Sequence, residues 1–239
     1  MINTESSLNS LFVGVKYKIL VLRSLLLSLC IYGCLDYCLP QEIRDYIASV
    51  HGGKYLYLTN MCLYFTVGTL VVGMSVRYFS CKGLVVSYIN LVSVVLPLEL
   101  LVTVLFWTLF LIDPTLVRDK DLYEQGVRVD LLSDLSMHLF PFIALLLEQY
   151  DIKIVREKSH VLFFSIFCVF YFLLCLAFSR ANGFWVYPIL DKLSPVGKIM
   201  LFAFSNLFVV AFYELFVFLS SKKTFFIFSK DSKREIEKK

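Results

Sequence analysis

The chain has 239 residues, of which 59% are hydrophobic, 16% are aromatic and only 18% are charged. This balance excludes an ordinary soluble domain and indicates an integral membrane protein, although the formal net charge is a modest +4. Long continuous apolar runs also exclude a membrane β-barrel, whose strands show short alternating segments.

Six stretches are long and apolar enough to predict transmembrane helices, since a span needs roughly 20 mainly apolar residues. They lie at about 18–39, 56–76, 84–112, 131–149, 161–179 and 199–219. We therefore predict an all-α fold, a single transmembrane domain over residues 1–239 built as a bundle of six helices. A short N-terminal segment at 1–17 and a basic tail at 220–239 flank the bundle.

The basic residues predict the orientation. An even number of spans puts both termini on one side of the membrane, and 15 of the 23 Lys and Arg fall on that side. Both termini are therefore expected in the cytosol. The basic tail has interleaved aromatic residues, as nucleic-acid binders also do, but directly after a span it is better explained by contact with anionic lipid headgroups. We expect no nucleic-acid partner.

The first span is predicted to be a retained signal anchor, because Lys16 and Lys18 precede it and no small-residue cleavage site follows. Cys30, Cys34 and Cys38 share one face of this helix. The seven cysteines lie almost entirely within predicted spans, without CxxC pairs, and the chain has only three histidines. Packing is favoured over disulfide or metal chemistry, so no metal and no cofactor is expected.

The second span follows a loop with a Gly-Gly turn and places Thr59 and Asn60 about one turn inside its exoplasmic end. Thr59, Thr66 and Gly73 recur every seven residues. Small residues at such spacing are typical of close helix packing in membranes. From spacing alone, Thr59 is interpreted as a structural residue.

The third span carries Glu99 near its middle. A carboxyl group at that depth is either protonated or paired. A water or proton path is the functional interpretation, and a neutral hydrogen bond between helices is the more common one. The loop that follows alternates acidic and basic residues and is interpreted as a solvated connection rather than a site.

The fourth span places Asp134, His138 and Glu148 in a segment otherwise fit for lipid. Ionisable groups at that depth usually face the bundle interior or a wet cavity, and each is a candidate for function. Asp130, Asp134 and His138 are four residues apart and form one ladder on a helix. Asp134 either accepts a hydrogen bond from the imidazole or is only an anion near the helix start. His138 is either functional or a hydrogen-bonded packing residue.

The loop before the last span places Trp185 and Tyr187 beside Pro188 and predicts an interfacial hairpin on the exoplasmic side. In this topology Thr59, His138 and the hairpin share one face of the protein.

Four motifs occur in order along the chain: KYLYLT, LPLELLVTVLFW, MHLFPFIALLLE and GFWVYP. With them the chain resembles the androgen-induced-gene family, also called the FAR-17a-like family, over most of its length. Members of this family are multi-pass membrane threonine hydrolases that split fatty acid esters of hydroxy fatty acids, using one Thr and one His. The resemblance implies Thr59 as nucleophile, His138 as base and a location in the endoplasmic reticulum. It assigns no role to Glu99.

The implied chemistry needs a base beside the threonine, because a hydroxyl is a poor nucleophile at its own pKa. The developing oxyanion needs fixed donors, for which Asn60 and backbone N–H groups at the start of the second span are candidates. Other possible supporting residues are Glu99, Asp134, Trp185 and Tyr187. The expected substrate is a bilayer lipid with long acyl chains. The alternative is a non-catalytic lipid-binding scaffold, or a small transporter with Glu99 and His138 on a polar path.

Overall fold

The computed structural model describes residues 17–236, and within that range the regular elements are all helices. The predicted all-α class is confirmed. The helices of the bundle are α2 (Tyr17–Cys34), α4 (Leu58–Tyr78), α5 (Val85–Ile112), α7 (Leu131–His138), α8 (Phe140–Gln149), α9 (Lys158–Asn182) and α11 (Pro195–Ile236). Short elements connect them: η1 (Asp36–Cys38), α3 (Gln41–Ser49), η2 (Gly53–Leu56), η3 (Lys82–Leu84), η4 (Pro114–Leu116), α6 (Lys120–Glu124) and α10 (Pro188–Lys192).

The membrane character is confirmed, but the predicted count of six spans is not. Four helical stretches in the described part are long and apolar enough to cross a bilayer: Leu58–Tyr78, Lys82–Ile112, Lys158–Asn182 and Pro195–Lys222. The pair α7 and α8 makes a fifth if it is counted as one broken span, whereas the apolar part of α2, Ile19–Cys34, is shorter. The predicted N-terminal segment up to residue 16 and the last three residues of the predicted tail lie outside the described residues.

The sequence predicted that the first helix would end near Pro40, but it ends at Cys34. Leu35 leaves the helical conformation, with φ −81° and ψ 138°. The carboxylate of the next residue, Asp36, is exposed and pairs with the Lys54 ammonium at 2.5 Å. A charged group is costly in an apolar layer, so the apolar helix ends before Asp36.

The fourth predicted span is broken into two helices. The chain leaves helical geometry at Leu139 (φ −133°), and α7 and α8 meet at a bend of 40°. Pro141 explains the break, because proline has no N–H and its ring clashes with the carbonyl four residues earlier. Proline is tolerated in a first turn, and α8 restarts with Pro141 there. His138 is consequently the last residue of α7, directly at the break.

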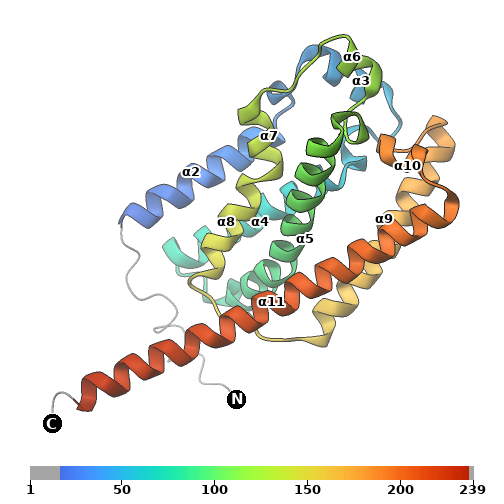
Figure 1. Ribbon diagram of the computed structural model, residues 1–239. Coiled ribbons are helices and arrows are strands. Elements are labelled where there is room, and N and C mark those ends of the chain that lie inside the picture. Colours follow the sequence, from blue (N-terminus) through green and yellow to red (C-terminus); the bar gives the residue numbers. More distant parts are fainter. Residues whose placement is uncertain (1–16, 237–239) are drawn as a thin grey trace.

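α5 is the central helix and packs against α4, α8, α9 and α11, while α2 packs against α4, α7 and α8. Figure 1 shows the short helices α3, α6 and α10 near one end of the bundle, which we call the loop end. α2 and α7 approach closely at Gly33, where an added Cβ would lie 2.8 Å from the Ser136 carbonyl oxygen. Small residues allow such contacts between membrane helices.

The loop end is tied together across distant parts of the chain. The predicted Gly-Gly turn is present, with positive φ at Gly52 (87°) and Gly53 (52°). Beside it, the His51 backbone N–H donates to the Asn182 side-chain oxygen at 2.9 Å, and the Asn182 amide donates to the His51 carbonyl at 3.1 Å. The turn between α3 and η2 is thereby joined to the end of α9.

Candidate functional site

A polar cavity at the loop end brings together five residues that the sequence singled out. It is lined by Thr59, Asn60, Asp134, His138 and Tyr187, and its volume is about 130 Å³. Most of the remaining lining comes from α3 and from the connection between α5 and α7. The predicted shared face of Thr59, His138 and the penultimate loop is therefore present as one cavity.

Two tyrosine hydroxyls hold the start of α4 beside Thr59. The Leu58 backbone N–H donates to the Tyr171 hydroxyl and to the Tyr187 hydroxyl, each at 2.9 Å. The Tyr171 hydroxyl in turn donates to the Leu56 carbonyl at 2.9 Å. Burial raises the pKa of Tyr187 to about 12, so this hydroxyl is neutral near pH 7. Thr59 is thus the second residue of a helix whose start is fixed by α9 and by the loop before α10.

The first N–H groups of a helix have no partner inside it, and near Thr59 they are the donors that remain. The Asn60 side-chain amide donates to the Lys54 carbonyl at 3.0 Å, which commits it to the η2 turn. The partial positive charge of a helix N-terminus favours a nearby anion. The backbone of Thr59 and Asn60 is accordingly better suited to meet an oxyanion than the Asn60 side chain.

The buried imidazole of His138 is oriented by the backbone of its own helix. Its Nδ1 lies 3.0 Å from the Asp134 carbonyl oxygen and 3.7 Å from the Asp134 carboxylate. A carbonyl oxygen only accepts hydrogen bonds, so Nδ1 carries the proton and Nε2 is the basic nitrogen. The expected link between Asp134 and His138 therefore runs chiefly through the main chain.

Arg118 is the main site residue that the sequence did not indicate. It forms an ion pair with the Asp134 carboxylate and has only 17% of its side chain exposed. Its guanidinium carbon lies 5.3 Å from the centre of the Phe106 ring, and that ring stacks on His138 with 3.4 Å between centroids and 3° between planes. The interpretation of the connection between α5 and α7 as a solvated loop is wrong for Arg118. The spacing of the alternating charges in this connection does not distinguish Arg118 from the other charged residues.

Asp130, the first member of the predicted ladder, has a local role. Its carboxylate caps α7 by accepting from the Ser133 backbone N–H at 3.0 Å and from the Ser133 hydroxyl. These hydrogen bonds hold the pKa of Asp130 below its usual value. The role of a helix-start anion therefore belongs to Asp130, whereas Asp134 lines the cavity.

Glu99 and Trp185 do not line the polar cavity. Glu99 is fully buried and accepts a hydrogen bond from the Thr66 hydroxyl at 2.6 Å, which links α5 to α4. The Trp185 ring packs against Phe172, with the Lys198 ammonium 5.1 Å from its centre. The contact of Glu99 is the hydrogen bond between helices that the sequence offered as the more common alternative.

We expect Glu99→Gln to keep both the fold and most of any turnover, because a glutamine side chain still accepts from Thr66. Glu99→Leu removes that acceptor and should lower the melting temperature, as losing a buried partner costs about 1–3 kcal/mol. Thermal unfolding of purified protein and a lipid-ester assay measure the two effects. A normally folded Glu99→Gln protein without turnover would instead favour a proton path through Glu99.

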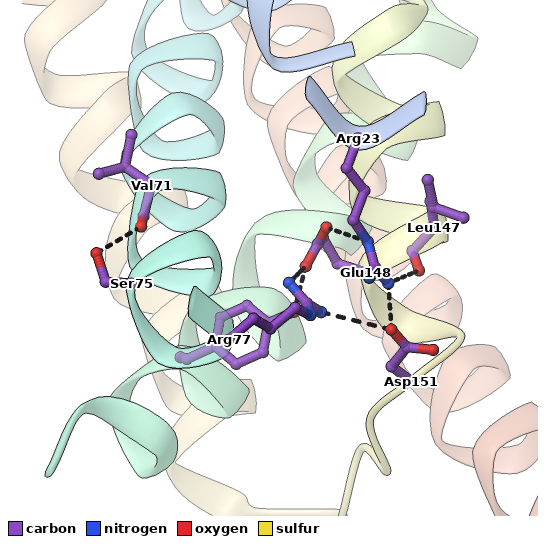
Figure 2. A network of polar contacts seen from close by, with 8 residues as sticks. Arg23, Val71, Ser75, Arg77, Leu147, Glu148 and Asp151 are labelled. Atoms are coloured by element: carbon purple, nitrogen blue, oxygen red, sulfur yellow. Dashed lines mark hydrogen bonds and ion pairs between the residues drawn. The ribbon is translucent and has the colours of Figure 1, made fainter. Parts of the chain in front are cut away.

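A second polar cluster lies at the opposite end of the bundle, where Figure 2 shows Glu148 between Arg23 and Arg77. Glu148 Oε1 is 3.0 Å from Arg23 Nε, its other oxygen pairs with Arg77, and Asp151 pairs with Arg23. Gly73 makes room for it, because an added Cβ would lie 3.1 Å from both Arg77 Nη1 and Glu148 Oε2. The ionisable groups of the predicted fourth span thus belong to two separate clusters.

Within the residues that the structure describes, no group of His, Cys, Asp and Glu side chains is arranged to hold a metal ion, and the seven cysteines are free thiols. The polar cavity offers a hydroxyl, an imidazole, an ion pair and backbone donors.

A comparison with known protein families identifies the family of this chain. The family model for FAR-17a/AIG1-like protein matches residues 20–221. The chain belongs to the FAR-17a/AIG1-like family. The matched range of this FAR-17a/AIG1-like protein includes the whole lining of the polar cavity.

Two curated proteins are similar to it. A UPF0641 membrane protein of Schizosaccharomyces pombe is 28% identical over 165 residues, covering 67% of this chain and 72% of the relative. The androgen-dependent TFPI-regulating protein of Mus musculus is 29% identical over 205 residues, covering 76% of this chain and 84% of the relative. No solved structure matches the chain.

Proposed function

We propose that this FAR-17a/AIG1-like protein is an intramembrane lipid ester hydrolase with Thr59 as nucleophile and His138 as general base. The observation that carries the proposal is that both side chains line the same polar cavity, with His138 Nδ1 occupied by a backbone carbonyl. The substrates are esters like the fatty acid esters of hydroxy fatty acids that family members split.

The reaction begins when His138 Nε2 takes the hydroxyl proton of Thr59 while its oxygen attacks the ester carbonyl. The tetrahedral intermediate then breaks its bond to the alcohol oxygen, and the imidazolium returns the proton to that oxygen. The alcohol leaves and the acyl group remains as an ester of Thr59. Water, deprotonated by the same imidazole, attacks this ester. The bond to the Thr59 oxygen then breaks, the imidazolium returns the proton to that oxygen, and the fatty acid leaves.

Two features of the cavity support the charged states along this path. The backbone N–H groups at the start of α4 are fixed donors for the oxyanion, and such donors stabilise a transition state strongly in a dry site. The Asp134 carbonyl accepts from Nδ1 and stabilises the imidazolium. Arg118 neutralises the Asp134 carboxylate, which favours a neutral imidazole in the resting protein, the form that can accept a proton.

The membrane setting fits the substrate class, because an ester with two long acyl chains can enter sideways from the bilayer. We propose that both termini lie in the cytosol, in line with the distribution of the basic residues. The location in the endoplasmic reticulum is proposed from the family resemblance. The basic tail would then contact anionic headgroups.

The runner-up is a lipid-binding scaffold without turnover, which a second, apolar cavity favours. That cavity, also of about 130 Å³, lies between α5, α9 and α11. Nothing favours the transporter, because Glu99 lines neither cavity and so does not continue a path from His138.

Purified protein in liposomes distinguishes the hydrolase from the scaffold. A fatty acid ester of a hydroxy fatty acid is added, and released fatty acid and bound ester are quantified by mass spectrometry against protein-free liposomes. The hydrolase releases fatty acid in proportion to protein. Bound ester that stays intact would establish the scaffold instead.

A further inference from the structure

The apolar and polar cavities share part of their lining at the proposed nucleophile. Thr59 lines both, and so do Phe106, Val117 and Tyr187. His138, by contrast, lines only the polar cavity. A molecule whose reacting carbon lies at Thr59 therefore has two different spaces for its two arms.

The position of the imidazole determines which cavity holds the acyl chain and which holds the alcohol. His138 must return a proton to the leaving alcohol oxygen, so that oxygen has to lie on the side of the polar cavity. The acyl chain is the other substituent of the carbonyl carbon and extends away from the leaving oxygen. It is then directed toward the apolar cavity.

The lining of the apolar cavity suits a hydrocarbon chain. Most of it is Leu, Val, Ile and Phe, and two of its polar side chains form hydrogen bonds within their own helix or to a neighbouring one. The Ser205 hydroxyl donates to the Leu201 carbonyl at 2.8 Å, and the Cys168 thiol to the Phe202 carbonyl at 3.3 Å. The Asn206 side-chain oxygen is buried without a hydrogen-bond partner, so the cavity offers a polar ligand only a few groups within a mostly hydrocarbon lining.

The end of the cavity farthest from the loop end, which we call its floor, is lined by residues of three helices. α5 and α9 run toward the loop end and α11 runs away from it, so the deepest lining residues are Leu98, Phe164 and Val209. All three are nearly inaccessible and belong to one buried cluster. From Leu98 to Leu109 the lining follows α5 for roughly 16 Å at about 1.5 Å per residue.

We propose that the apolar cavity holds the acyl chain that is transferred to Thr59, and that Val209, with Leu98 and Phe164, sets the longest chain accepted. This inference rests on the proposed hydrolase function and adds a substrate direction to it. The alcohol arm occupies the polar cavity.

The test is a chain-length profile with one leaving group: the butanoyl, octanoyl, dodecanoyl and hexadecanoyl esters of p-nitrophenol. Val209→Phe places a larger side chain at the floor and shortens the cavity. It should lower kcat/KM for the hexadecanoyl ester by about tenfold or more, because each methylene excluded from the cavity lowers kcat/KM about fourfold. Butanoyl hydrolysis should stay within about twofold. Val209→Ala lowers the floor and should shift the preference to longer chains, which keeps the test decisive if the larger side chain prevents folding.

Val169→Phe is the matched control, because Val169 lies on α9 and is 59% exposed on the outer face of the bundle. It should leave the profile unchanged. If wild-type protein hydrolyses the esters but both Val209 variants keep its profile, the acyl cavity is wrong while the hydrolase stands.

A binding measurement tests the acyl cavity even when no ester hydrolysis is detected. A hexadecanoyl ester with a diazirine at its chain end is photolysed with the Thr59→Ala protein, and the labelled peptides are mapped. Labelling around Phe164 and Val209 supports the acyl cavity even if no ester is hydrolysed, an outcome that would refute only the proposed function. Labelling confined to α3 and α6 would overturn the inference.

Discussion

Replacing either member of the proposed pair, as Thr59→Ala or His138→Ala, is expected to lower kcat/KM for a lipid ester by about 10³-fold or more. The first change removes the attacking oxygen and the second the group that takes its proton. The double variant should be scarcely worse than either single one, because members of one catalytic unit are strongly non-additive. Thr59→Ser keeps a hydroxyl and should retain part of the activity. Progress curves with purified protein give these values.

Two controls guard against a loss of activity through misfolding. Thr69→Ala changes a threonine on the same helix whose hydroxyl donates to the Phe65 carbonyl, and His51→Ala changes an exposed histidine at the loop end. Neither residue lines a cavity described above, so both variants should keep wild-type rates. Wild-type turnover by the Thr59→Ala protein would refute the assignment.

The second large effect is expected on stability, at the opposite end of the bundle. Glu148→Gln should destabilise the protein by about 3–5 kcal/mol, because it leaves two buried guanidinium groups with too little negative charge. Arg23 and Arg77 (Figure 2) have only 3% and 1% of their side chains exposed. The Tyr88 hydroxyl donates to the Glu148 carboxylate as well. Thermal unfolding in detergent measures the change.

The chain offers a matched control for that variant. Glu214 pairs with Arg156 at 2.8 Å, but the side chains are 36% and 70% exposed. Exposed pairs contribute about 0–1 kcal/mol, so Glu214→Gln should barely move the unfolding midpoint. Equal midpoints for the two variants would show that the buried cluster does not stabilise the fold.

Hydropathy alone was sufficient for the fold class and for the approximate place of the helices, because an apolar run of span length can satisfy its backbone in a membrane only as a helix. It did not locate the end of α2 or the break at Leu139. Those depend on single residues, Asp36 and Pro141, whose local effect outweighs the average apolarity of the segment.

The candidate site was predictable in part. Helical spacing placed Asp134 and His138 on one ladder, and topology placed Thr59 and Tyr187 at the same end of the bundle. The contribution of Arg118 was not predictable, since it depends on how a connection folds back over α7. The same limit applies to Arg23 and Glu148, which are 125 positions apart in the sequence and meet only in the packed bundle.

The most direct measurement of the central claim is the covalent intermediate itself. Purified protein is mixed with a hexadecanoyl ester, quenched in acid within the first turnover, digested and analysed by mass spectrometry. We expect an added hexadecanoyl group on the peptide that contains Thr59, and its absence from the Thr59→Ala protein. An acyl group on any other residue, or rapid turnover with Thr59 never modified, would contradict the account.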